Sequence, residues 1–243
     1  MNFYAVIIGT EILNGRREDK HFDFVKHALA KYGHELFASF TIKDDKELIK
    51  SVYRMIQADP EAVMFSFGGI GSTPDDLTRE LAAEVFTNKP TLPHKKFQQD
   101  IIEKFAQKAF PHRIHMADLP QGAELLHNPV NNMSGFSLQN KYFFVPGFPS
   151  MAHPMINDVI EKYFFKTTPT YRLTLLANTS EETLISLMQK VPASIELSSL
   201  PMFVQEKPKV ELSLSSQNRA ALEQTFELFK KELEEKNIPY KLI

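Results

Sequence analysis

The sequence predicts an α/β protein: a doubly wound parallel sheet followed by a small α+β domain of ferredoxin-like type. In the first part of the chain, apolar strand-like runs alternate with amphipathic helical segments, which is typical of a parallel sheet covered by helices. After Pro169 the order becomes strand, helix, strand, strand, helix, strand, which matches a split βαβ unit. We therefore expect domains at residues 1–167 and 170–243, with Lys166-Thr167-Thr168-Pro169 as the linker.

The elements of the first domain follow from its apolar pattern. Continuous apolar runs predict buried strands at 3–8, 36–42, 63–67 and 141–145. Apolar residues at helical spacing predict helices at 19–32, 44–59, 91–110 and 150–165, with one more opening at Pro74. Gly33 ends the first helix, and either Asp44 or Asp45 caps the second. Prolines and glycines break residues 111–140 into short pieces.

The second domain follows the same logic with shorter elements. Its predicted strands and helices cover residues 171–176, 181–189, 194–200, 210–215, 218–236 and 240–243, in the order given above. The helix at 218–236 is long and amphipathic, with a charged, solvated face.

The segment after the third strand carries the strongest functional signal. It reads Gly68-Gly69-Ile70-Gly71-Ser72-Thr73-Pro74-Asp75-Asp76. Thr73 is expected to cap a helix, Pro74 to occupy its first position, and Asp76 to complete a capping box. Glycines let backbone N–H groups approach a ligand, and a helix N-terminus favours an anion such as phosphate. An acid at the same place can hold a metal ion or orient a water, so the segment predicts nucleotide or phosphorylated-cofactor chemistry.

Other polar residues follow predicted strand ends. Gly9-Thr10-Glu11 follows the first strand, Asp44 the second and Pro146-Gly147 the fourth. Ligands of doubly wound sheets bind beyond the carboxyl ends of the strands, so these turns are candidates for the same site.

Composition excludes several classes of protein. The 243 residues carry a net charge of −2 and contain no cysteine, which excludes disulfides and thiolate sites and provides no global field for nucleic acid. No apolar run approaches the roughly 20 residues of a membrane span, and the N-terminus lacks the basic region of a signal peptide. We expect a cytoplasmic protein without nucleic-acid or membrane partners.

Several motifs together resemble a known family. They are Gly9-Thr10-Glu11-Ile12-Leu13-x-Gly15, Asp44, the Gly68–Glu80 segment, Asn128-Pro129-Val130, Gly135-Phe136 and Pro146-Gly147-x-Pro149. In order and spacing they resemble the competence-damage-inducible CinA proteins, whose N-terminal domain is similar to the molybdopterin-binding domain of MogA, MoaB and MoeA. The tail from Tyr171 is similar to the small middle domain of CinA proteins. The C-terminal deamidase domain that many of them carry is expected to be absent from this chain.

The resemblance implies a metal-dependent ADP-ribose pyrophosphatase, or in the MogA branch an enzyme that adenylates molybdopterin. The family's acids correspond to Asp44 and Asp76, as catalytic and metal-binding residues. Mg²⁺ suits such oxygen ligands, with another divalent cation or K⁺ as further candidates. The expected nucleotide- or pterin-binding residues are Gly9, Thr10, Glu11, Gly68, Gly69, Gly71, Ser72, Thr73, Pro146 and Gly147. The family also implies a homo-oligomer, expected to be a dimer.

Structural alternatives stand beside these roles. Asp76 could simply complete a capping box, and Asp44 or Asp45 could simply cap a helix. Phe67 or Phe148 could stack on an adenine, although packing in the core is the favoured interpretation. His112 and His115 have metal-like spacing, but no helical frame brings them together, which favours surface histidines.

The sequence departs from the family pattern at several expected ligand loops. Asp19-Lys20-His21 replaces Asn-Thr-Asn or Asp-Thr-Asn, and Ser72 replaces proline. Asn131-Asn132-Met133 replaces Gly-Thr-Ala, and Met151 stands where the family has glutamate. These departures motivate an alternative function, a nucleotide- or molybdopterin-binding protein with weakened or lost catalysis. A molybdenum-cofactor biosynthesis protein is the remaining alternative.

Overall fold

The chain forms two compact units, residues 1–165 and 166–243. The computed structural model describes residues 1–165 and 170–243, so the predicted linker at 166–169 lies outside the described residues. Each unit has its own sheet and its own apolar core.

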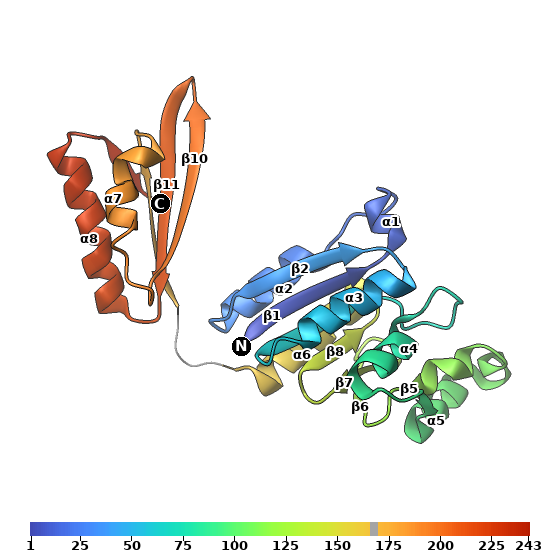
Figure 1. The fold of residues 1–243 in the computed structure, drawn as a ribbon. Helices are drawn as coiled ribbons and strands as arrows, with labels where there is room; N and C mark the ends of the chain where they lie inside the picture. Colours follow the sequence, from blue (N-terminus) through green and yellow to red (C-terminus); the bar gives the residue numbers. More distant parts are fainter. Residues whose placement is uncertain (166–169) are drawn as a thin grey trace. The chain divides into compact units, whose positions relative to one another are not determined.

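The first unit is built on a six-stranded sheet (Figure 1). Its order is β2 (Leu36–Ile42), β1 (Asn2–Ile8), β3 (Ala62–Phe67), β8 (Tyr142–Val145), β7 (Gly135–Leu138) and β6 (Glu124–Leu126). The first four strands are parallel, while β7 and β6 add antiparallel pairs at one edge. The predicted doubly wound sheet is therefore confirmed, with an antiparallel extension that arises from the segment broken by prolines and glycines.

Helices cover both faces of this sheet. On one face, α2 (His21–Lys31) and α6 (Pro149–Tyr163) bury Leu29 and Ile160 against Phe3 and Phe65. On the other face lie α3 (Lys46–Gln57) and the short α4 (Thr78–Ala82), which continues as the π-helical turn Ala83–Thr87. Burial on both faces explains why the parallel strands are continuous apolar runs.

The helix predicted at 91–110 is shorter than expected. α5 (Lys95–Phe105) begins at His94, whose Nδ1 accepts a hydrogen bond from the Phe97 amide at 3.3 Å. Two 3₁₀ turns, Ala106–Ala109 and Arg113–Ala117, follow it. A two-residue ladder between β4 (Leu92–Pro93) and β5 (Asp118–Leu119) closes this segment.

The second unit has the predicted ferredoxin-like arrangement. Its sheet has the order β10 (Glu196–Val204), β11 (Lys207–Ser216), β9 (Tyr171–Ala177), β12 (Tyr240–Leu242), with every pair antiparallel. The turn Glu181–Leu184 and α7 (Ile185–Met188) form the first crossover, and α8 (Arg219–Glu235) forms the second. α8 buries Phe226 and Phe229 in the same apolar cluster as Leu212 and Leu214 of β11.

No helix of residues 1–165 or 170–243 combines the length and hydropathy needed to cross a membrane.

Three strand ends of the first unit come into close contact at Gly68. This residue has φ +97°, and a Cβ built on it would lie 2.5 Å from the Ile8 carbonyl oxygen at the end of β1. A Cβ built on Gly147, just after β8, would lie 3.4 Å from the Gly68 Cα. Glycine is required at position 68 by both the backbone angle and the space.

Gly68→Ala tests this contact against Gly15→Ala. Gly15 also has a positive φ, +75°, but nothing lies within 4 Å of a Cβ built there. We expect Gly15→Ala to cost about 1 kcal/mol of unfolding free energy, from backbone strain alone. Gly68→Ala adds a clash with backbone and should cost about 3 kcal/mol or more. Urea unfolding measures both, and equal losses would contradict the close contact.

Candidate functional site

The turns that follow the parallel strands meet at the carboxyl edge of the first sheet. The Gly9 amide donates to the Ile42 carbonyl at 3.0 Å, which joins the ends of β1 and β2. The Gly68 amide donates to the Val145 carbonyl at 3.0 Å, which joins β3 to β8. The structure thus brings the predicted glycine turns to one edge of the sheet.

Asp44 anchors the turn after β1. Its Oδ2 accepts hydrogen bonds from the Thr10 amide at 2.8 Å and the Thr10 hydroxyl at 2.9 Å, where the short helix α1 (Thr10–Leu13) begins. Asp45 caps α3 instead, because its Oδ1 accepts from the Leu48 amide at 2.9 Å. The sequence allowed either acid to cap α3, and the structure shows that Asp45 does so. Asp44 instead connects the turn after β2 to the turn after β1.

Asp76 organises the glycine loop through the contact to the Thr73 amide that a capping box includes, and through a contact to the Gly71 amide that the sequence did not predict. Its Oδ1 accepts from the Gly71 amide at 2.8 Å, and its Oδ2 accepts from the Thr73 amide and hydroxyl at 2.8 and 2.6 Å. A Cβ built on Gly71 would lie 2.6 Å from this carboxylate, so a side chain at position 71 would displace the Asp76 carboxylate from its present place. The predicted helix start at Pro74 is wrong: Asp76 holds the preceding residues in a turn, and α4 begins only at Thr78.

Two residues that follow Asp76 support the same loop. The Thr78 hydroxyl donates to the Gly68 carbonyl at 3.0 Å, and Arg79 Nη1 donates to the Gly71 carbonyl at 2.5 Å. Arg79 is only 9% exposed. Burial lowers the pKa of its guanidinium, while the nearby Asp76 carboxylate acts in the opposite direction. Neither Thr78 nor Arg79 was predicted to support the loop, although both lie within the motif Gly68–Glu80.

The loop has both bonded and free amides at the positions predicted to face an anion. The amides of Gly71 and Thr73, expected to face a phosphate, are taken by Asp76. In residues 1–165 the amides of Gly69, Ile70 and Ser72 have no hydrogen-bond partner. The free donors of this loop are therefore backbone amides, and α4 is too short to add a helix terminus to them.

The carboxylates of Asp44 and Asp76 accept hydrogen bonds from two different turns. Asp44 follows β2 and Asp76 follows β3, the two strands that flank β1. Among the described residues, no group of three or more His, Cys, Asp or Glu side chains is placed to hold a metal ion. A cation here would therefore depend on one or two carboxylates and on oxygens of its ligand.

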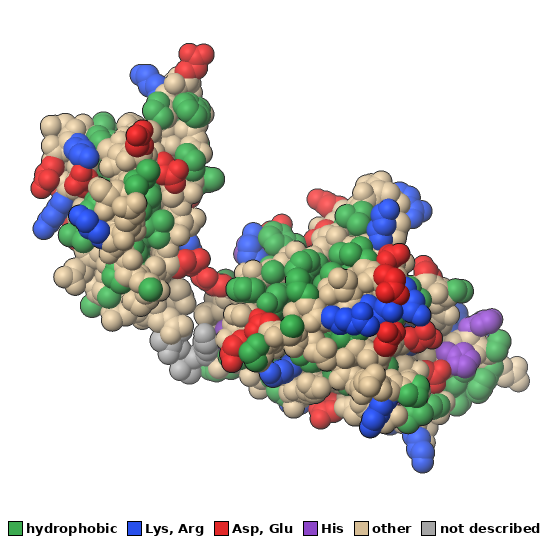
Figure 2. Space-filling view, viewed as in Figure 1, with side chains coloured by type: hydrophobic (Ala, Val, Ile, Leu, Met, Phe, Trp, Pro, Cys, Tyr) green, Lys and Arg blue, Asp and Glu red, His purple; other side chains and the backbone are tan. Residues whose placement is uncertain are grey.

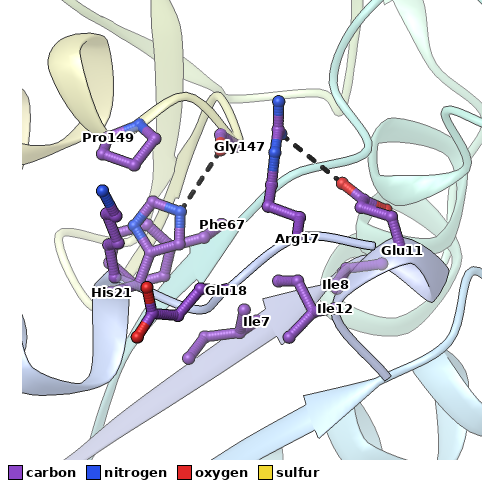
Figure 3. A pocket seen from close by; sticks show the side chains of 11 residues that line it. Ile7, Ile8, Glu11, Ile12, Arg17, Glu18, His21, Phe67, Gly147 and Pro149 are labelled. Atoms are coloured by element: carbon purple, nitrogen blue, oxygen red, sulfur yellow. Dashed lines mark hydrogen bonds and ion pairs between the residues drawn. The ribbon is translucent and has the colours of Figure 1, made fainter. Parts of the chain in front are cut away.

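A small pocket lies where β1 and β8 end (Figure 3). Its volume is about 20 Å³, room for about one water molecule. Of the predicted site residues, Glu11 and Gly147 line it. Figure 3 shows Arg17 extending towards Glu11, with 3.6 Å between their charged groups. The Arg17 guanidinium also lies 5.5 Å from the centre of the exposed Phe148 ring. A ligand would have to displace these side chains.

The comparisons with known proteins agree with the fold and the motifs. A family model described as a probable molybdopterin binding domain matches residues 4–166. The chain belongs to this family.

Individual relatives support the predicted resemblance to CinA proteins. A CinA-like protein of Nostoc punctiforme is 33% identical over 162 residues, 64% of this chain and 38% of the relative. A CinA-like protein of Desulfotalea psychrophila is 28% identical over 229 residues, 88% of this chain and 54% of the relative. The chain thus spans roughly two fifths to one half of these relatives. The crystal structure of a CinA protein of unknown function from Thermoplasma acidophilum is similar with a TM-score of 0.60 and 25% identity, covering 68% of this chain and 99% of that one.

His21, which departs from the CinA pattern, forms a hydrogen-bonded relay with His153. His21 Nε2 lies 3.3 Å from the Gly147 carbonyl oxygen, and His21 Nδ1 lies 3.2 Å from His153 Nε2 (Figure 3 shows the first contact). A carbonyl only accepts, so His21 carries its proton on Nε2 and accepts from His153 at Nδ1. The Phe67 ring stacks on His21 with centres 4.3 Å apart and is fully buried, which confirms core packing for this phenylalanine.

Two other departures from the CinA pattern contact each other. The Asn131 side-chain amide donates to the Met151 sulfur at 3.3 Å. The resemblance implies a glutamate at position 151 and a Gly-Thr-Ala segment beginning at position 131, where this chain has Met151 and Asn131. The loops that carry these two departures contact each other, and the thioether of Met151 is only a weak acceptor.

The histidine relay predicts a loss of stability in acid. Burial and the neighbouring His21 lower the pKa of His153 to about 4, and burial lowers the pKa of His21. The unfolded chain has histidine pKa values near 6.5, so it binds more protons than the folded chain between pH 4 and 6.5. The stability that this histidine pair contributes is fully present above about pH 6.5 and is lost as the pH drops towards 4.

His153→Gln tests this relay, because its side-chain amide can donate to His21 Nδ1 without titrating. We expect thermal unfolding midpoints of the variant to fall less steeply than those of the natural chain between pH 6.5 and 4. An equally steep fall would show that His153 does not carry the acid sensitivity.

Proposed function

We propose that the chain is a divalent-metal-dependent pyrophosphatase acting on ADP-ribose or a related nucleotide. The supporting observation is the glycine loop, where an oriented carboxylate at Asp76 lies beside free amides of Gly69, Ile70 and Ser72. Membership of the molybdopterin-binding family and similarity to CinA-like proteins favour a phosphorylated ligand at this loop.

The residues present fit a magnesium ion that is held mainly by the phosphates of the substrate and only partly by protein carboxylates. Asp44 uses only Oδ2 for Thr10, so within the described chain its Oδ1 has no hydrogen-bond donor. Asp76 Oδ1 accepts a single hydrogen bond. Mg²⁺ commonly binds through one or two carboxylates together with substrate phosphates and water, which suits this inventory. When bound, such a cation neutralises charge on the pyrophosphate oxygens; Co²⁺ and K⁺ are further candidates.

The chain's own residues then position the phosphates and the attacking water, and stabilise the negative charge that develops on the phosphate oxygens. The free loop amides donate to phosphate oxygens, and donors fixed before the reaction stabilise developing negative charge. Three hydrogen bonds fix the Asp76 carboxylate, which can accept from a water molecule and orient it towards phosphorus. The buried Arg79 holds the loop through Gly71 and adds positive charge behind it.

Turnover of ADP-ribose to AMP and ribose 5-phosphate tests the proposal. With Mg²⁺ or Co²⁺ we expect product formation that chelation by EDTA abolishes. Asp76→Asn and Asp44→Asn should each lower kcat by about 100-fold or more, because the loss of a negative oxygen weakens metal and water binding. Asparagine retains the shape of both side chains, and at position 44 its one oxygen can still accept from Thr10. At position 76 the amide NH2 replaces one of two accepting oxygens, so thermal unfolding of Asp76→Asn is measured beside its turnover.

Asp45→Asn is the matched control. Asparagine caps helices as well as aspartate does, so the capping of α3 survives and activity should stay within about twofold. Background turnover in the natural chain, or equal turnover in the Asp44, Asp45 and Asp76 variants, would refute the proposed hydrolase.

A second candidate function is binding of a nucleotide or pterin without catalysis. The contact between Asn131 and Met151 favours it, because both departures remove family residues from the ligand edge together. This alternative predicts saturable binding of AMP, ADP-ribose or a pterin in calorimetry with no product. The homodimer and the cytoplasmic location that the resemblance and the composition suggest stay predictions.

A further inference from the structure

An open groove lies on the outer side of the glycine loop, apart from the small pocket at Gly147. We call it the basic groove; it is lined by Ser72, Thr73, Pro74, Lys108, Phe110, His112 and Arg113. Its volume is about 660 Å³, within the range of roughly 300–1,000 Å³ typical of small-molecule sites. The first three residues belong to the loop, and the other four to the segment after α5.

The titratable side chains that line the groove are all basic: Lys108, His112 and Arg113. The acids Asp75 and Asp76 follow Pro74 outside this lining, and the Asp76 carboxylate is hydrogen-bonded to Thr73. The ion pairs of this segment of the described chain join Lys96 to Asp100 and His115 to Asp118, and they leave the groove cations without an acidic partner. Because the whole chain has a net charge of −2, this concentration of basic groups does not reflect composition. Figure 2 shows histidine side chains exposed at the end of the first unit where α5 lies in Figure 1.

Arg113 is held in position without a carboxylate. Its Nη1 donates to the Lys108 carbonyl at 2.8 Å, and its guanidinium lies 4.8 Å from the centre of the Phe105 ring. These contacts use one nitrogen and one face, so other N–H donors remain for a ligand. A guanidinium with a fixed orientation is suited to phosphate, which it can bind through two parallel hydrogen bonds.

The groove also offers an apolar ring and free loop donors. Phe110 is 57% exposed, so its ring is available for a planar group to stack on. The Ser72 amide and hydroxyl have no hydrogen-bond partner in residues 1–165. A ligand that satisfies all these groups carries both phosphate oxygens and a flat ring.

We propose that the basic groove binds the nucleoside-phosphate half of the ligand. Arg113 and Lys108 contact its phosphate, Phe110 stacks on its base, and Ser72 faces the phosphate from the loop. This assignment rests on the proposed function, in which the free amides of the same loop bind the pyrophosphate. Binding of the nucleoside phosphate itself requires neither metal nor catalysis.

Metal-free titration with ADP and with ribose 5-phosphate tests the groove separately from turnover. We expect ADP to bind the natural chain, and more weakly at higher salt. Lys108→Gln and Arg113→Gln should each raise the Kd of ADP by about tenfold, the effect of losing one charge-assisted contact. Phe110→Leu should weaken ADP and leave ribose 5-phosphate unchanged, because only ADP carries a base. Lys95→Gln, an exposed lysine on α5 outside the groove, should leave the Kd of ADP within about twofold.

The outcomes distinguish the two proposals. Weaker ADP binding in the Lys108 and Arg113 variants, with unchanged circular dichroism, supports the groove even if ADP-ribose is not hydrolysed. Absence of ADP binding to the natural chain, or equal Kd values in the natural chain and the Lys108 variant, overturns the groove even if ADP-ribose is hydrolysed. The Lys108 variant decides the matter if Arg113→Gln unfolds, because the Lys108 side chain makes no hydrogen bond or ion pair within the described residues.

Discussion

The close packing of three strand ends at Gly68 is the constraint on which the site depends. The left-handed backbone at this residue, and the absence of a side chain, let β3 turn directly against the Ile8 carbonyl and Gly147. The loop that follows therefore starts from a fixed point at the carboxyl edge of the sheet. Thr78 ties the other end of the loop back to the Gly68 carbonyl, so both ends are anchored by the same residue.

Between these anchors, hydrogen bonds to charged side chains hold the loop in place of regular secondary structure. Asp76 satisfies two amides that a helix would otherwise have left unpaired, and Arg79 satisfies the Gly71 carbonyl from the other side. Gly71 is only partly buried and Thr73 is exposed, so these bonds fix the shape of the loop rather than rescue buried backbone groups, and charged partners make them short. The consequence is that Asp76 has a structural role and an available oxygen lone pair at the same time. The sequence allowed either a structural or a functional role for Asp76, and the two roles are therefore compatible.

The sequence predicted the fold well because residues that are buried in the sheet are apolar and form a recognisable pattern along the chain. Strands β1 and β3 are covered on both faces and read as apolar runs, and the change of pattern after Pro169 marks the second unit. The site was harder to predict, because its contacts join distant segments. Thr10 meets Asp44 across 34 positions, and His21 meets His153 across 132. Local capping rules placed a helix start at Pro74, where hydrogen bonds to the Asp76 side chain hold a turn instead. The basic residues of the groove are scattered along a segment without periodicity, so only the folded chain brings them next to Ser72.

The two sides of the glycine loop differ in what they can accept. On the side of Gly147, the pocket is nearly filled by Glu11 and Arg17, and His21, Asn131 and Met151 depart from the family pattern near this edge. On the side of Ser72, a groove of about 660 Å³ is open and its cations lack acidic partners. Burying a charge without a partner is costly, whereas exposed cations beside an open groove lose little by remaining unpaired until an anion arrives. The ligand binding proposed for the open side therefore does not depend on the side chains that fill the other side. The family's fold and the altered loop residues of this chain are compatible for this reason.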